Sequence, residues 1–98
     1  MKIKTSELTG AALDWAVAKC EGVVYHGPAW TKYSTDWSQG GAIIEREKIN
    51  IYEISGVWKA DIPGIQLSRS GPTPLIASMR CYVKFKLGDT VDVPEELI

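Results

Sequence analysis

The run "SRSGPTP" in the C-terminal half of the chain combines side chains that could hold an anion where a helix begins. Arg69 supplies a positive charge, Ser70 and Thr73 supply hydroxyls, and Gly71 allows close approach to the backbone. The first N–H groups of a helix lack internal partners, and the helix dipole places partial positive charge beside them. The run therefore predicts a phosphate or carboxylate site. A simpler interpretation needs only Thr73 as the helix cap and Pro74 in the first turn.

The second candidate is the run "GPAWTKYSTDWSQGG", whose glycines and proline predict a loop. It carries the aromatic residues Trp30, Tyr33 and Trp37 among polar ones. Stacking of a planar base on such rings is worth about 1–3 kcal/mol per base, and Asp36 and Gln39 could then bind the edge of that base. The alternative is that the rings tuck under the loop and complete a small hydrophobic core.

Catalytic and metal-binding chemistry has less support. The single histidine, His26, has no serine or cysteine placed beside it by a known motif, and no spacing of carboxylates selects an acid–base pair. Cys20 and Cys81 fall inside expected helices, and with one histidine they are too few for a zinc motif. We expect both thiols to be reduced and packed. The run "EREK" is interpreted as a solvated edge, and we expect no catalytic residue, no metal and no cofactor.

Length and charge narrow the class of protein. The 98 residues have room for one domain, residues 1–98, and 45% of them are apolar. Eleven basic and twelve acidic residues leave a formal charge of -1, which disfavours a nucleic-acid binder. No apolar run approaches the roughly 20 residues that span a bilayer, so no membrane association is expected.

Two long helices stand out in the pattern of apolar residues. The first, "LTGAALDWAVAKCEG", has Thr9 as its N-cap and Gly22 as its stop. The second runs from Thr73 to Leu87 with an apolar stripe along one face. The expected strands are "MKIK", "GVVYHG", "INIYEI", "VWKADI" and "TVDV", with one helical turn at "AIIERE" and a loop at "PGIQLSRSGP". These elements predict an α+β fold, with two helices packed on a small, mainly antiparallel sheet.

Three runs, "MKIKTSELTGAALDWAVAKCEG", "STDWSQGGAIIERE" and "GPTPLIASMRCYVKFKLGDTVDVPEEL", resemble the NinX-like family of small proteins from lambda-type phages and prophages. The resemblance covers nearly the whole chain. It implies a phage accessory protein in the host cytoplasm, and it brings no activity and no catalytic residues. A fainter similarity, of architecture and context, is to phage sponge proteins that sequester cyclic nucleotide or ADP-ribose-type immune signals, often as oligomers.

Two functional hypotheses follow. The first is a non-enzymatic binder of a phosphate-bearing nucleotide-type immune signal, which counters host defence and could enclose its ligand as a homo-oligomer. Its ligand-binding residues would be Trp30, Tyr33, Asp36, Trp37, Gln39, Arg69, Ser70, Gly71 and Thr73. The alternative is a protein–protein adaptor that binds a host or phage recombination protein through the aromatic loop, because Trp, Tyr and Arg are enriched at such contacts.

Overall fold

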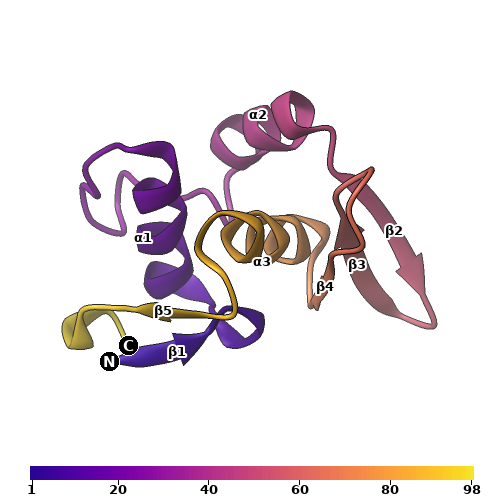
Figure 1. Ribbon diagram of the computed structural model, residues 1–98. Helices are drawn as coiled ribbons and strands as arrows, with labels where there is room; N and C mark the ends of the chain where they lie inside the picture. Colours follow the sequence, from indigo (N-terminus) through magenta and orange to yellow (C-terminus); the bar gives the residue numbers. More distant parts are fainter.

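The computed structural model describes residues 1–98 (Figure 1). The α+β class is confirmed, but the expected two helices on one sheet are three helices and two separate antiparallel sheets. In chain order the elements are β1 (Lys2–Lys4), α1 (Gly10–Glu21), α2 (Trp37–Glu47), β2 (Asn50–Ile54), β3 (Val57–Asp61), β4 (Ser68–Gly71), α3 (Pro74–Leu87) and β5 (Thr90–Asp92). Short 3-10 helices at Thr5–Glu7 and Glu95–Leu97 complete the chain.

Helix α3 lies at the centre of the molecule and packs against both sheets and both other helices (Figure 1). Its predicted apolar stripe is largely confirmed, since Leu75, Met79, Tyr82 and Val83 are buried. The predicted start is also confirmed, because the Thr73 hydroxyl accepts a hydrogen bond from the Ile76 N–H at 3.0 Å. Burial of one helix from several sides explains how so short a chain builds a continuous core.

The three-stranded sheet has the order β2-β3-β4, and α3 covers one of its faces. The β2–β3 hairpin is confirmed, with Ile54 paired to Val57 around a turn at Ser55 and Gly56, both at positive φ. The prediction of a loop over the whole of "PGIQLSRSGP" is wrong for Ser68–Gly71, which form β4. Tertiary packing explains the difference: a Cβ on Gly71 would stand 2.8 Å from the backbone nitrogen of Ala77, so glycine lets β4 lie directly against α3.

The second sheet joins the two ends of the chain, with Ile3 of β1 paired to Val91 of β5. Helix α1 packs against α3 and ends at Gly22, as predicted, in the left-handed conformation. Thr9 does precede α1, although its side chain makes no capping hydrogen bond. None of the helices is long and apolar enough to cross a bilayer.

The predicted strand at "GVVYHG" is wrong, because residues 23–26 pair with no other strand. Val23 and Val24 are instead exposed beyond the end of α1. Branched side chains favour a strand only where a neighbouring strand and a core face exist to receive them. Here the chain leaves α1 at the surface and finds neither.

The predicted loop at "GPAWTKYSTDWSQGG" is also wrong at its end, since α2 begins at Trp37. The Asp36 carboxylate caps the helix by accepting from the Ser38 N–H at 2.9 Å. The sequence did not predict a helix here because two glycines in its interior each cost about 1 kcal/mol of helix propensity. Gly40 has a packing reason: a Cβ there would overlap the Tyr33 carbonyl oxygen and stand 2.7 Å from Leu75 Cδ1.

Candidate functional site

The aromatic segment and the start of α3 meet in space. A cavity of about 200 Å³ lies between them and is lined by Ser34, Thr35, Trp37, Thr73, Pro74, Leu75 and Ile76. Its walls come from the first residues of α2 and α3 and from the segment before α2. Of the predicted ligand-binding residues, the cavity brings together Trp37 and Thr73.

The three predicted aromatic residues divide into two groups. The side chains of Trp30 and Trp37 are 76% and 53% exposed. Tyr33 is partly buried against the core, and burial raises the pKa of its phenol. The core-filling interpretation therefore describes Tyr33, whereas the two tryptophans lie at the surface.

The polar residues beside these rings are occupied within the segment itself. Gln39 accepts from the Lys32 N–H at 2.8 Å and donates to the Trp30 carbonyl oxygen at 3.0 Å. Asp36 accepts from both the N–H and the hydroxyl of Ser38, and these bonds lower the pKa of its carboxyl group. Asp36 and Gln39 thus hold the segment in place. Their polar groups are already hydrogen-bonded within the segment, where binding the edge of a base would need them free.

Helix α1 also holds this segment, through a hydrogen bond to its backbone. The Asp14 carboxylate, which is 6% exposed, accepts a hydrogen bond from the Ser34 N–H at 2.8 Å. Burial raises the pKa of Asp14, and Ser34 partly offsets that effect. The Ser34 hydroxyl itself is buried and has no hydrogen-bond partner. A buried, charged acceptor therefore positions the wall of the cavity.

The start of α3 offers little to an anion. Pro74 has no N–H, the Ile76 N–H binds the Thr73 hydroxyl, and the Ala77 N–H binds the Thr73 carbonyl. Leu75 is then the one residue of the first four whose N–H is left for a ligand. No charged side chain lines the cavity, so a phosphate would find neither a cation nor a cluster of donors there.

The other residues predicted to hold the anion lie along β4. Arg69 donates to the Ser68 carbonyl at 2.8 Å and forms an ion pair with Asp89 at 3.4 Å. The Ser70 carbonyl accepts from Arg80 at 3.0 Å. Together with Gly71, which packs on α3, Arg69 and Ser70 do not line the cavity.

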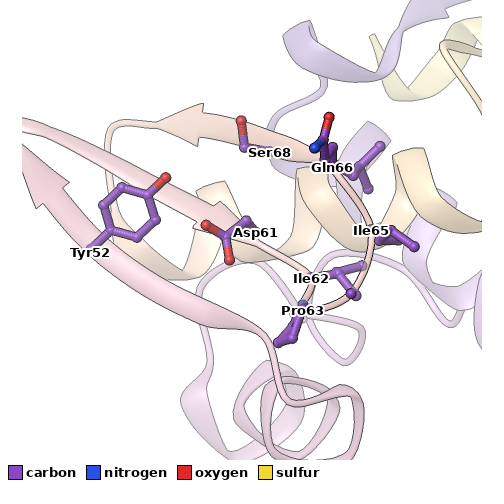
Figure 2. A pocket seen from close by; sticks show the side chains of 9 residues that line it. Tyr52, Asp61, Ile62, Pro63, Ile65, Gln66 and Ser68 are labelled. Atoms are coloured by element: carbon purple, nitrogen blue, oxygen red, sulfur yellow. The ribbon is translucent and has the colours of Figure 1, made fainter.

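Sequence analysis missed a larger cavity of about 460 Å³ between the hairpin and residues 62–67 (Figure 2). Figure 2 shows the Tyr52 phenol on the same side of the sheet as Asp61 and Ser68, with Ile65 across the opening. Asp61 accepts from the Asn50 amide at 3.0 Å. The segment "PGIQL" was interpreted only as a loop, and no local signal predicts that it folds over the hairpin.

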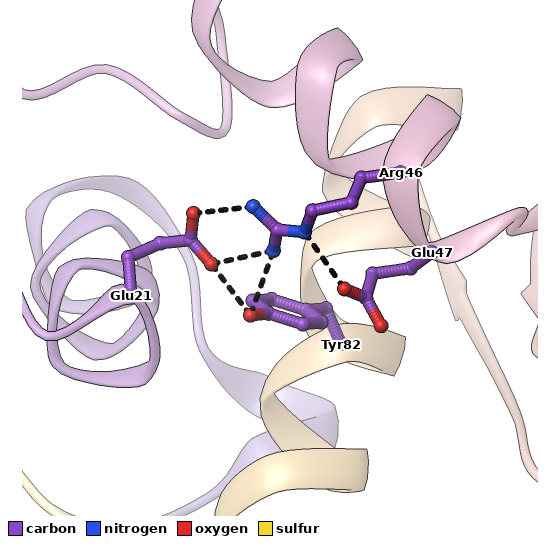
Figure 3. Close-up of polar contacts among 4 residues, drawn as sticks. All are labelled: Glu21, Arg46, Glu47 and Tyr82. Atoms are coloured by element: carbon purple, nitrogen blue, oxygen red, sulfur yellow. Dashed lines mark hydrogen bonds and ion pairs between the residues drawn. The ribbon is translucent and has the colours of Figure 1, made fainter.

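A polar network holds α2 in place (Figure 3). Arg46 of α2 makes a two-pronged contact with Glu21 of α1, at 2.9 and 2.7 Å, and also binds Glu47 at 2.8 Å. The buried Tyr82 of α3 donates to Glu21 at 2.5 Å and accepts from Arg46 at 3.0 Å. The interpretation of "EREK" as a solvated edge is therefore wrong for Arg46, which joins three helices. Such pairing cannot be inferred from local sequence because its partners are 25 and 36 residues away.

Comparison with known proteins places this architecture in a family. The family model described as "Bacteriophage P22, NinX" matches residues 4–86, and the chain belongs to that family. The resemblance found in the sequence is thereby confirmed. No curated protein matches the chain. Membership establishes a bacteriophage context and specifies no activity.

Proposed function

We propose that this phage protein is a non-enzymatic interaction protein that binds a partner protein at the cavity between the starts of α2 and α3. One observation carries the proposal: Trp37 is more than half exposed where it lines a cavity without charged side chains, and Trp30 of the same aromatic segment is also exposed. Removing exposed apolar surface from water is favourable, and exposed apolar patches mark sites of interaction with other molecules. Trp is also among the residues that contribute most to protein–protein association.

The size and chemistry of the cavity support a protein partner. Small-molecule sites usually enclose about 300–1,000 Å³, whereas this cavity encloses about 200 Å³. That volume suits one apolar side chain of a partner, inserted between the Trp37 ring and the Pro74–Leu75 corner. The partner would present an apolar or aromatic side chain on a surface without strong charge. In the infected host it would be a host protein or another phage protein, such as a recombination protein.

The nucleotide hypothesis stays a prediction. It is supported by the shared cavity of Trp37 and Thr73, where a base could stack beside a helix start. Two features weaken it: Arg69 is paired with Asp89 away from the cavity, and the Asp36 carboxylate adds negative charge at the start of α2. A phosphate-bearing immune signal would then need its cation from a second copy of the chain.

Site-specific photocrosslinking in phage-infected cells tests the proposal. A photoreactive residue replaces Thr35, which lines the cavity, and in the control it replaces Phe85, an exposed aromatic residue outside the cavity. We expect the first position alone to crosslink a defined protein. The purified partner should then bind the Trp37→Ala variant about 30-fold more weakly, as for a hot-spot residue, and bind Phe85→Ala normally.

Other outcomes contradict the proposal. Equal crosslinking from Thr35 and Phe85 would indicate nonspecific contact. Equal affinity of the partner for wild type and Trp37→Ala would move the interface elsewhere. A species of nucleotide mass, seen by native mass spectrometry in the wild type and lost in Trp37→Ala, would favour the sponge hypothesis instead. Gently purified protein from cells that carry a defence system is the sample for that measurement.

A further inference from the structure

The two edges of the β2-β3-β4 sheet differ in their free hydrogen-bonding groups. On the β4 edge, the Ser68 carbonyl accepts from Arg69 at 2.8 Å and the Ser70 carbonyl accepts from Arg80 at 3.0 Å. Arginine side chains therefore occupy the acceptors that a further strand would need. Covering an edge in this way is a common defence against unwanted strand pairing.

The β2 edge has no such cover. The two-residue turn makes Ile54 and Val57 a hydrogen-bonded pair, so the bonds to β3 alternate along β2 from Ile54. The backbone groups of Ile51 and Glu53 consequently point away from β3, and neither makes any other hydrogen bond. The strand has no proline and no bulge, and Figure 1 shows it at the outside of the sheet with no element beyond it.

We propose that β2 pairs antiparallel with β2 of a second copy, about a two-fold axis at Tyr52, and joins two sheets into one of six strands. This register places Ile51 opposite Glu53 of the second copy, and Glu53 opposite Ile51. Each pair exchanges two N–H···O bonds, because both residues have outward-facing groups. The edge is thus complementary to itself, which is what a two-fold interface requires.

Neighbouring strand registers would be less favourable. An axis at Glu53 would place two carboxylates directly opposite each other, which is destabilising in a sheet, and would pair Ile51 with Ser55 in the turn. An axis at Ile51 would pair Glu53 with Ile49, whose side chain is buried in the core. Only the axis at Tyr52 uses all the outward groups within the strand.

The face of the sheet away from α3 also favours a second copy. Tyr52 and Ile54 lie on the face that α3 does not cover, and both are exposed. In the proposed dimer the two Tyr52 rings are direct cross-strand neighbours, and Ile54 lies opposite Asn50. This interface shares no residue with the cavity at α2 and α3, so it stands whether or not the proposed function is correct.

Concentration-dependent sedimentation of the wild type and of two proline variants tests the proposal. Glu53→Pro removes an outward N–H without touching the β2–β3 bonds, and proline is tolerated where the N–H faces solvent. Ser68→Pro makes the matched change at the first residue of the opposite edge. We expect a reversible wild-type dimer, at least about tenfold weaker association for Glu53→Pro, and no change for Ser68→Pro. A wild type that is monomeric up to its solubility limit, or equal effects of both prolines, overturns the proposal.

Disulfide trapping tests the register in variants that keep every backbone N–H. Non-hydrogen-bonded cross-strand pairs have Cα atoms about 4.5 Å apart, within disulfide range, so Tyr52→Cys should crosslink to itself under mild oxidation. Lys59→Cys, on the same face of the central strand, would lie roughly 14 Å from its copy, three strand spacings away, and should not. Burial raises the pKa of the native Cys20 to about 12, which keeps it unreactive. Absence of a Tyr52→Cys crosslink in a dimeric sample refutes this register.

Discussion

Gly40 and Gly41 are adjacent in α2, and alanine at these two positions should have opposite effects on stability. Alanine favours a helix interior by about 1 kcal/mol over glycine. At Gly41 the new Cβ would meet only Trp37 Cε3, at an ordinary 3.4 Å, so Gly41→Ala should gain up to about 1 kcal/mol. At Gly40 the Cβ would overlap the Tyr33 carbonyl oxygen and crowd Leu75 Cδ1 at 2.7 Å. Overpacking of this kind costs about 1–3 kcal/mol, and because backbone is involved we expect the upper half of that range.

The net expectation for Gly40→Ala is a loss of about 1–2 kcal/mol, so the two variants should differ by about 2 kcal/mol. For a chain of this size that is a separation of roughly 10 °C in Tm. Urea unfolding followed by tryptophan fluorescence measures the free energies, and the amide signal of Ser34 reports whether the segment before α2 moves. Equal stability of the two variants would refute the close approach of α2 to Tyr33 and to α3.

Substitutions at two further positions probe the groups that hold the site in place. Asp14→Ala leaves the buried Ser34 N–H without an acceptor and should cost about 1–3 kcal/mol in urea unfolding at pH 7, whereas Asp14→Asn keeps an acceptor without the cost of a buried charge and should be at least as stable as the wild type at that pH. Because burial raises the pKa of Asp14, the wild type should lose stability as the pH rises through that pKa. Asp14→Asn has no group to ionise and should not lose stability there. An equal loss in the wild type and in Asp14→Asn would contradict this. Arg46→Ala should cost about 1 kcal/mol, since the guanidinium is half exposed, and Arg46→Lys less. Arg46 lowers the pKa of Glu21. The stability lost in Arg46→Ala should therefore become smaller as the pH drops through the Glu21 pKa and Glu21 is protonated. A loss that does not depend on pH would count against the pairing with Glu21 and Tyr82.

Elements with strong local signals were predictable from the sequence. The α3 helix has a capping threonine, a proline in its first turn and a long apolar stripe, and each of these was found in place. The hairpin is specified by a two-residue turn between alternating strands. In both cases the residues that fix the element lie within it.

Elements that depend on distant partners were not predictable. Helix α2 needs glycine at position 40 because a Cβ there would overlap the Tyr33 carbonyl, and strand β4 ends in Gly71 because a Cβ there would crowd the backbone of α3. Val23 and Val24 have strand propensity, but the fold places no strand beside them. For the site, the sequence located the exposed rings and the start of α3. No local pattern indicated that Arg69 would pair with Asp89 or that Gln39 would bind the backbone of its own segment.

The segment before α2 reverses the usual arrangement of polar and apolar residues, and this bears on how it binds. Thr31 and Ser34 are buried, at 6% and 2% exposure, while Trp30 and Trp37 face water. Covering both rings would contribute about 3–6 kcal/mol at 1.5–3 kcal/mol for each large apolar side chain. Association costs about 4–15 kcal/mol in lost freedom of motion, so covering the rings alone leaves at most about 2 kcal/mol and gives only weak binding. A partner must also fill the cavity beside Trp37, which is why a flat apolar surface should bind this protein far more weakly than one with a protruding side chain.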